Sequence, residues 1–289
     1  DDAGNLTLRD VGIQNGDSYG YDLTGGAILN KNSLTLIGAQ VSDSRAQQLG
    51  GAIYAEPDSV TTITDTLITA NTVWDEYGEG GGLALAGQAT ISGTTITHNS
   101  AQEGGGIHVR SGETTIRDSL IFVNVARGEY GGIGGGISIS DTYGEVGRAT
   151  IIDSTIAGNF AAGGMDYGGY GGGIAVSGVA TISGSTIVGN SATSGGQYGP
   201  GAPFDKPGQG GGVWVRGSAH ITNTTISGND ANRGGGLWSS GELSLVHSTV
   251  TGNVGRREAD EYGGTQPGRG GGLYLTAYEW TSNVTTLQR

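Results

Sequence analysis

The chain has 289 residues, of which 60 are glycine, five are proline and none is cysteine. The lack of cysteine excludes disulfide bonds, zinc–thiolate sites and thiol catalysis. Fourteen basic against 27 acidic residues give a net charge of −13, so nucleic acid and anionic membrane faces are excluded as favourable partners. No apolar run approaches the roughly 18 residues of a membrane span, and none is predicted.

Two short motifs alternate along the chain. The first, Gly-Gly-(Gly/Ala)-aliphatic, occurs nine times, beginning at Gly25, Gly50, Gly80, Gly104, Gly134, Gly171, Gly210, Gly234 and Gly270. The second, aliphatic-x-x-Asn, occurs seven times, ending at Asn71, Asn99, Asn124, Asn159, Asn190, Asn229 and Asn253. A repeat of fixed order and this size predicts a solenoid, in which each unit stacks only on its neighbours.

The shortest unit, residues 82–106, contains three segments with the alternation of a strand. They are residues 83–86, 89–92 and 94–96, which are rich in aliphatic residues and threonine and are separated by glycine. This pattern predicts one coil of a parallel β-helix with three short strands. We therefore expect residues 1–289 to form a single all-β parallel β-helix of about nine to ten coils.

Each part of the repeat has a structural interpretation. The aliphatic residues are expected to point inward and to stack on their equivalents about 4.8 Å along the axis. Glycine supplies positive φ and space at the sharp turns. Asparagine tolerates the left-handed conformation, and its amide can bond to the next coil. The seven asparagines from Asn71 to Asn253 are therefore predicted to form a structural ladder and to take no part in catalysis.

The extra residues of the longer units fall almost entirely between the asparagine and the next glycines, with a bulge at residues 141–147 as the main exception. Asn99 and Gly106 are 7 residues apart, whereas Asn190 and Gly212 are 22 apart, so one corner of the coil accepts loops. These loops gather acids and tyrosines, which are candidate binding residues: Asp75, Tyr77, Tyr130, Asp166, Tyr167, Tyr198, Asp205, Asp260 and Tyr262. Such side chains suit a sugar or an arginine-rich protein face. Alternatively, they only keep the corner soluble.

A second candidate site follows from the position after the first inward aliphatic residue of each coil. In three consecutive coils this outward position holds Trp214, Trp238 and Tyr274, with Arg216 beside them. Stacked aromatic side chains on a sheet suit a carbohydrate or a protein contact. The alternative is a ladder that stabilises itself beneath a loop.

Groups for catalysis are scarce. The four histidines, His98, His108, His220 and His247, fall at unrelated positions of the coil, so the sequence specifies no histidine–acid pair. We predict no catalytic residue, no metal site and no cofactor, and we favour a protein without enzyme activity. Two alternatives stay open: Ca²⁺ binding, which no motif specifies, and a glycosidase-like pair among the loop acids.

The paired motifs resemble the repeats of chlamydial polymorphic outer-membrane proteins and related bacterial right-handed β-helix surface proteins. Those repeats usually carry phenylalanine where this chain has Ile68, Ile96, Ile121, Ile156, Ile187, Ile226 and Val250. The resemblance covers about residues 25–275. It implies a right-handed helix, export, display at the cell surface, and an adhesive or structural role without catalytic residues.

We therefore expect an extracellular or cell-surface adhesive or structural module. Strand-like residues 6–8 and 284–287 lie near the two ends without a capping helix, and open solenoid ends tend to pair. This predicts end-to-end assembly into a filament, or a segment of a longer surface protein. The expected partners are another copy of the chain, or a protein or glycan at the loop corner. The alternative is a polysaccharide-binding or polysaccharide-degrading β-helix that uses the same corner.

Overall fold

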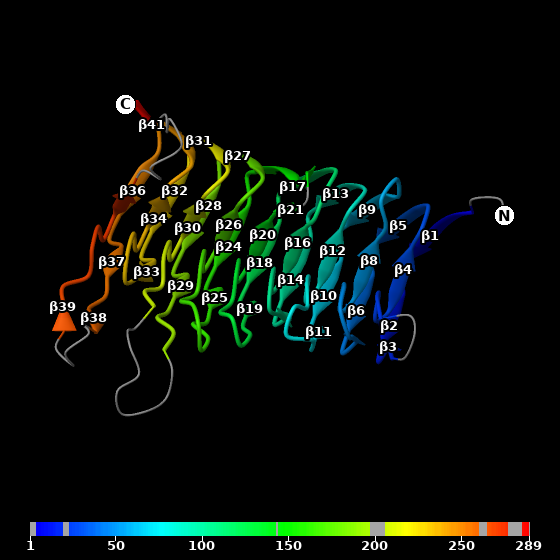
Figure 1. The fold of residues 1–289 in the computed structure, drawn as a ribbon. Helices are drawn as coiled ribbons and strands as arrows, with labels where there is room; N and C mark the ends of the chain where they lie inside the picture. The colour runs from blue at the N-terminus through cyan, green and yellow to red at the C-terminus, as the bar shows by residue number, and fades with distance from the viewer. Residues whose placement is uncertain are drawn as a thin grey trace.

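The computed structural model of the chain describes residues 4–19, 23–142, 144–196, 206–259, 265–276 and 285–288. These residues form a parallel β-helix whose coils stack from the N-terminal to the C-terminal end of the molecule (Figure 1). Four long parallel sheets run the length of the body, each receiving one strand per coil. Three of these sheets have nine strands and one has ten, and together they make about eight complete turns. The predicted all-β solenoid is confirmed.

The first sheet follows the Gly-Gly motif. Its nine strands are β4 (Ile28–Asn30), β8 (Ile53–Ala55), β12 (Leu83–Leu85), β16 (Ile107–Val109), β20 (Ile137–Ile139), β26 (Ile174–Val176), β30 (Val213–Val215), β34 (Leu237–Ser239) and β40 (Leu273–Leu275). Equivalent residues pair directly, as Ile107 does with Ile137. Equivalent residues of successive repeats therefore form a line of side chains parallel to the helix axis.

The second sheet has the longest strands. It contains β1 (Asn5–Arg9), β5 (Ser33–Ile37), β9 (Val60–Thr64), β13 (Gln88–Ser92), β17 (Glu113–Arg117), β23 (Arg148–Ile152), β27 (Val179–Ser183), β31 (Ser218–Thr222), β35 (Glu242–Val246) and β41 (Thr285–Gln288). The third sheet contains β2 (Gly12–Gln14), β6 (Gln40–Ser42), β10 (Leu67–Thr69), β14 (Thr95–Thr97), β18 (Leu120–Phe122), β24 (Thr155–Ala157), β28 (Thr186–Val188), β32 (Thr225–Ser227) and β36 (Thr249–Thr251).

A fourth sheet adds to the three strands per coil predicted from the repeat. Its members are β3 (Asp17–Ser18), β7 (Arg45–Ala46), β11 (Thr72–Val73), β15 (Ser100–Ala101), β19 (Val125–Ala126), β25 (Phe160–Ala161), β29 (Ser191–Ala192), β33 (Asp230–Ala231) and β37 (Val254–Gly255). Each has two residues and follows the ladder position of its coil. Two residues are too few to show alternation, so the sequence pattern did not reveal them.

Two short antiparallel hairpins project from the coils. One, β21 (Asp141–Thr142) with β22 (Glu145–Val146), lies between the first and second sheets. The other, β38 (Glu258–Ala259) with β39 (Thr265–Gln266), lies at the loop corner between the fourth and first sheets. The loop corner is at the lower edge of the molecule in Figure 1.

The core is a column of aliphatic side chains inside the coils. In the coil that contains β12, Leu83, Leu85, Ile91 and Ile96 are all fully buried, and the neighbouring coils repeat the pattern. Burying an aliphatic side chain of this size contributes roughly 1.5–3 kcal/mol. Stacking of coils is therefore the main source of stability.

The glycine motif makes the sharp turn before the first sheet. Gly104, its first residue in one coil, has a φ of 63°. The second, Gly105, packs so closely on the next coil that a Cβ there would lie 2.5 Å from the carbonyl oxygen of Gly135. The third position holds Ala27 and Ala52 in two coils, so of the three small residues of the motif only this one varies.

The seven predicted ladder asparagines are buried or partly buried, and their amides bond from coil to coil. The left-handed residue is a different one from that predicted, because none of the seven has positive φ. Instead the residue immediately before the asparagine does, as at Val123 with a φ of 53° and Gly158 with a φ of 59°.

Candidate functional site

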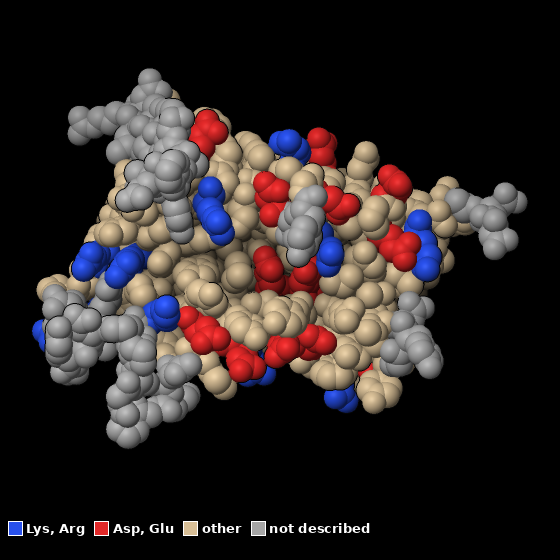
Figure 2. Space-filling model, viewed as in Figure 1, with Lys and Arg blue, Asp and Glu red and all other residues tan. Residues whose placement is uncertain are grey.

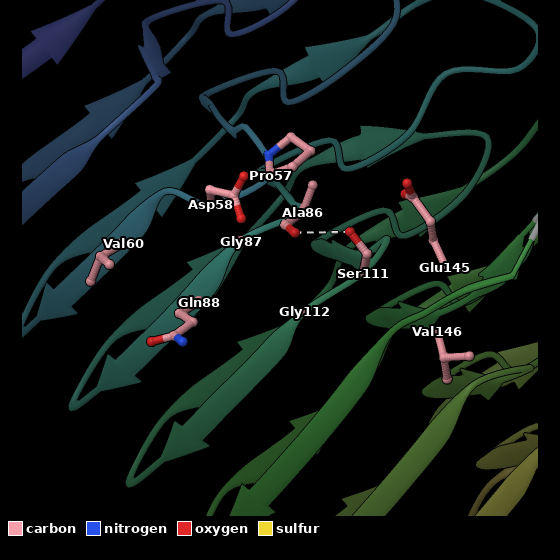
Figure 3. Close-up of a pocket in the computed structure, with 10 residues that line it drawn as sticks. All are labelled: Pro57, Asp58, Val60, Ala86, Gly87, Gln88, Ser111, Gly112, Glu145 and Val146. Carbon is pink, nitrogen blue, oxygen red and sulfur yellow. Dashed lines mark hydrogen bonds between the residues drawn. The ribbon is translucent and has the colours of Figure 1, made fainter. Parts of the chain in front are cut away.

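One hollow lies at the turns between the first and second sheets (Figure 3). Its volume is about 530 Å³, and its lining is mostly turn backbone. The carboxylates of Asp58 and Glu145 lie at opposite ends of it, and the Ser111 hydroxyl donates a hydrogen bond to the carbonyl of Ala86. The lining residues include no aromatic or basic side chain, so this hollow has few groups that could recognise a ligand.

A second hollow, of about 510 Å³, lies on the outer side of the first sheet, and we call it the aromatic groove. It is lined by Gln102, Glu103, Tyr130, Ile133, Tyr167, Tyr170, Ser177, Gln209, Trp214, Arg216 and Trp238. Both candidate sites from the sequence contribute to it: Trp214, Trp238 and Arg216 from the sheet, and Tyr130 and Tyr167 from the loop corner. The repeat brings them together because the corner loops lie directly before the first sheet in every coil.

Two rows of side chains build this outer face. The outer column consists of the middle residues of the first-sheet strands, which point outward because side chains alternate along a strand. It includes Ala84, His108, Ser138, Ala175, Trp214, Trp238 and Tyr274. The pre-motif column consists of the residues directly before the glycine motif. It includes Glu79, Glu103, Ile133, Tyr170, Gln209, Arg233 and Arg269, joined by parallel bridges.

An aromatic stack forms the C-terminal part of the groove. The rings of Tyr170 and Trp214 are 5.4 Å apart, and those of Trp214 and Trp238 are 5.5 Å apart at an angle of 9°. Tyr274 pairs with Trp238 in the next coil and packs against the same cluster. The two tryptophans are only 8% and 6% exposed, so the stack is a largely buried ladder that presents its edges to the groove.

The loop corner forms the rim of the groove. Tyr77 and Tyr130 stack with ring centroids 5.4 Å apart, and a hydrogen bond to Tyr77 raises the pKa of Tyr130 to about 12. Tyr167 is 49% exposed, and the Nζ atom of Lys206 lies 5.9 Å from the centre of its ring.

The remaining corner candidates differ in their placement. An oxygen of Asp75 accepts a hydrogen bond from the backbone N–H of Tyr77, which makes Asp75 part of the turn. Asp166 is half-buried in the same loop as Tyr167 and does not line the groove. Tyr198, Asp205, Asp260 and Tyr262 lie outside the described residues.

A cluster of charged side chains lies on the same face, three coils from Trp214 along the outer column. This acid–histidine cluster consists of Glu79, Glu103, His108 and Arg110. His108 Nδ1 lies 3.2 Å from Oε2 of Glu79, and His108 Nε2 lies 3.8 Å from Oε1 of Glu103. Arg110 contacts Oε2 of Glu79. Figure 2 shows acidic side chains in a hollow near the centre of this face, beside a basic one, with more acids along the lower rim.

Burial and charge act in opposite directions on the ionisation of this cluster. Burial would lower the pKa of His108, but the carboxylates of Glu103 and Glu79 outweigh it, and the pKa of His108 is raised. Burial would raise the pKa of Glu79, but His108 and Arg110 outweigh it, and the pKa of Glu79 is lowered. Both shifts favour the charged forms of the two groups.

The sequence pattern specified no histidine–acid pair, but the fold places His108 beside Glu79 and Glu103. The signal was present in the repeat, because glutamate precedes the glycine motif in two successive units and histidine occupies the outer column of the second. What the pattern lacked was the information that these two columns lie side by side in the folded coil.

The family of the chain follows from its coils and from a comparison with protein-family models. A model described as a right-handed β-helix region matches residues 1–202 of the 289. The chain belongs to the right-handed β-helix family. A search of curated proteins and a search of solved structures gave no match for this β-helix. Within the described part of the β-helix, no helix has the length and apolar character needed to cross a membrane.

The outer face of the β-helix can bind a ligand in two chemically distinct ways. Around Trp214, aromatic edges and the Arg216 guanidinium offer apolar contact and hydrogen-bond donation. Around His108, two carboxylates and an imidazole offer acceptor oxygens and a nitrogen. Because both centres lie on the first sheet, a ligand extended along the helix axis would meet both.

Proposed function

We propose that this β-helix is an adhesive module of an exported surface protein and that it binds a polysaccharide along the outer face of the first sheet. The observation that carries the proposal is the aromatic groove, in which the Tyr170–Trp214–Trp238 stack, the corner tyrosines and the side chains of Arg216 and Glu103 line one hollow. Apolar faces with a few convergent polar groups are typical of small-molecule and sugar sites.

The chemistry of the lining supports a sugar ligand. Sugar rings have an apolar face that packs on aromatic side chains and hydroxyls that bond to charged groups. The groove contains one group of each kind: the aromatic ring of Tyr167, the hydrogen-bond donor Arg216 and the acceptor Glu103. The groove follows the stacked coils, which favours an extended polymer over a single sugar.

The charge of the chain narrows the class of glycan. A net charge of −13 repels polyanions at a distance, which disfavours sulfated and uronate-rich chains. We therefore expect a neutral or amino-sugar polysaccharide. The resemblance of the repeats to those of chlamydial polymorphic outer-membrane proteins supports display at the cell surface and an adhesive role.

Binding is tested by a glycan array followed by titration calorimetry with the best ligand. Tyr167→Ala removes an exposed ring from the rim and is expected to weaken binding about three- to tenfold, in line with ~0.5–1.5 kcal/mol for an aromatic contact. Arg216→Met is expected to have a similar or larger effect. Phe122→Ala serves as the control, because Phe122 is an exposed aromatic residue on the third sheet.

Two results would overturn the proposal: no glycan bound by the unaltered chain, or equal weakening by Phe122→Ala and Tyr167→Ala. A reducing-sugar assay on the same mixtures distinguishes a binding module from a degrading enzyme. Specific binding without release of reducing ends is the expected outcome.

A further inference from the structure

The acid–histidine cluster has the composition of a metal site. Glu79 and Glu103 come from the pre-motif column of two successive coils, and His108 lies at the centre of β16. One ligand atom from each of the three residues lies within 4.8 Å of the others. Glu103 and His108 flank the glycine turn of one coil, and Glu79 lies in register with Glu103 in the preceding coil.

The histidine supplies an independent sign that a ligand belongs here. His108 is only 2% exposed, yet its Nδ1 atom has no hydrogen-bond partner. The Glu79 carboxylate lies 3.2 Å from Nδ1, and because a carboxylate has no proton to donate, it cannot satisfy an unprotonated Nδ1. A buried ring nitrogen without a partner is costly, and buried polar atoms in folded proteins normally have one.

The tautomer of His108 follows from its other nitrogen. The Ser140 hydroxyl lies 3.4 Å from the carbonyl oxygen of Val109 and 3.3 Å from that of Arg110, and it donates its proton to them. It therefore accepts the hydrogen bond from Nε2–H of His108, at 3.1 Å. In the neutral imidazole, Nδ1 then presents a lone pair to the Glu79 carboxylate. Two electron-rich atoms at that distance repel each other unless a proton on Nδ1 or a metal cation lies between them.

The distances suit a shared ion. Two donor atoms bound to one tetrahedral Zn²⁺, with bonds of about 2.0–2.1 Å, lie roughly 3.3 Å from each other. The Nδ1–Oε2 distance in the cluster is 3.2 Å. The outer partners also match the usual pattern, because Ser138 donates a hydrogen bond to Oε1 of Glu103 at 2.9 Å, and Ser140 orients the imidazole.

We propose that Glu79, Glu103 and His108 bind one divalent transition-metal ion of the Zn²⁺ class. The imidazole nitrogen disfavours Ca²⁺ and Mg²⁺, which prefer oxygen ligands throughout. Three protein ligands leave at least one coordination position open, and one of the three, Glu103, also lines the aromatic groove. The metal site does not depend on the proposed polysaccharide function.

The charges around the site set its affinity. With a neutral imidazole, the two carboxylates carry more charge than Arg110, which contacts Glu79. Tyr54, in the outer column of an earlier coil, interacts with the same charges. A divalent ion therefore enters a site of net negative charge, and the Arg110 guanidinium weakens its binding.

The experiment is a titration of chelator-treated full-length chain with Zn²⁺, followed by calorimetry and competition with a fluorescent chelator. We expect one ion per chain, and binding of Ca²⁺ at least about 100-fold weaker. Glu103→Gln and His108→Gln are each expected to weaken Zn²⁺ binding at least tenfold. Glu113→Gln, an exposed acid at the start of β17, is the matched control and should leave binding unchanged.

Arg110→Gln gives a result that loss of structure cannot imitate. Removing this positive charge is expected to tighten Zn²⁺ binding several-fold. Circular dichroism of each variant shows whether the coils are intact, and visible absorption of bound Co²⁺ reports nitrogen and oxygen coordination. Failure of the intact chain to bind Zn²⁺, or equal affinity in folded Glu103→Gln and in the control, would overturn the proposal. In that case a proton on Nδ1 of His108, and not a metal ion, offsets the charge of the Glu79 carboxylate.

Discussion

The side-chain oxygen of Asn190 accepts two hydrogen bonds from Asn159, one from its backbone N–H at 2.9 Å and one from its side-chain amide at 3.0 Å. The same pair of bonds joins each successive asparagine from Asn71 to Asn253. Each of these six amides also donates to a carbonyl of the preceding coil, as Asn159 does to Ile121. The ladder therefore ties three coils together at every step.

Asn159→Ala is expected to lower the free energy of unfolding by about 3 kcal/mol. It leaves the backbone N–H and side-chain amide of Asn124 without their acceptor, and the carbonyl of Ile121 without its donor. Each buried group left unpaired costs ~1–3 kcal/mol. Urea denaturation followed by circular dichroism measures the loss. Asn32→Ala, at an exposed position, is the control and should change stability by less than about 0.5 kcal/mol.

Val123→Gly is expected to stabilise the protein by about 1 kcal/mol. Val123 has a φ of 53°, which is unfavourable for a β-branched residue, whereas the equivalent position holds glycine at 158, 189, 228 and 252. Relief of this strain exceeds the entropy cost of glycine. Val188→Gly, in the strand β28, should destabilise instead. A lower melting temperature for Val123→Gly would contradict the interpretation.

The two later glycines of the motif should respond differently to alanine. In Gly135→Ala the new Cβ would collide with the carbonyl oxygen of Gly172 and with backbone of Phe160, and neither can move without shifting a whole coil. We expect a loss of at least about 3 kcal/mol. Gly136→Ala places its Cβ 2.7 Å from the carbonyl oxygen of Gly173, yet Ala27 and Ala52 occupy this position elsewhere, so its cost should be smaller. Equal losses in thermal denaturation would refute this ranking.

The metal-free protein should be most stable at mildly acidic pH as far as the acid–histidine cluster is concerned. The pKa of His108 lies above its usual 6.5, so its contribution is full below that pH and is lost as the pH rises through the folded value. The pKa of Glu79 lies below its usual 4.5, so its contribution is full above that pH and is lost as the pH falls. The two groups together therefore favour the folded state most between about pH 4.5 and 6.5.

Thermal denaturation with a chelator present, from about pH 3 to 9, tests this window. Comparison with variants removes the pH dependence of the rest of the chain. His108→Gln should lose part of the decline on the alkaline side, and Glu79→Gln part of the decline on the acidic side. The charged groups that face His108 are Glu79, Glu103 and Arg110, so a His108→Gln curve parallel to that of the unaltered protein would show that these charges are screened.

Much of the fold could be predicted because each coil contacts only its neighbours, so the pattern of one repeat determines the position of each residue in its coil. The inward positions of Leu83, Leu85, Ile91 and Ile96 follow from alternation, and all four are fully buried. The long loops were placed correctly at one corner, since most of the added residues precede the glycines, with the β21–β22 hairpin as an exception. The left-handed residue was assigned one position too late because asparagine adopts that conformation readily, whereas valine, as at Val123, does not.

The site was harder to predict because it depends on neighbours in space that belong to different columns. Trp214 and Trp238 were identified from the outer column, but their burial comes from packing with Tyr170, a residue of another column. Glu79 and Glu103 belong to no motif, since the same column holds Ile133 and Gln209 elsewhere. Periodicity shows which residues belong to one column. Only the folded coil shows which columns are in contact.

The outer column fixes the distance between binding centres in steps of one strand spacing. His108 and Trp214 are separated by Ser138 and Ala175, which is three strand spacings, or roughly 14 Å at about 4.8 Å each. Gain or loss of one complete repeat between them would change this separation by one strand spacing, about 4.8 Å, and leave both centres intact. The spacing between two binding centres on such a molecule is therefore an integer quantity, set by gene duplication and independent of the loops that decorate the corner.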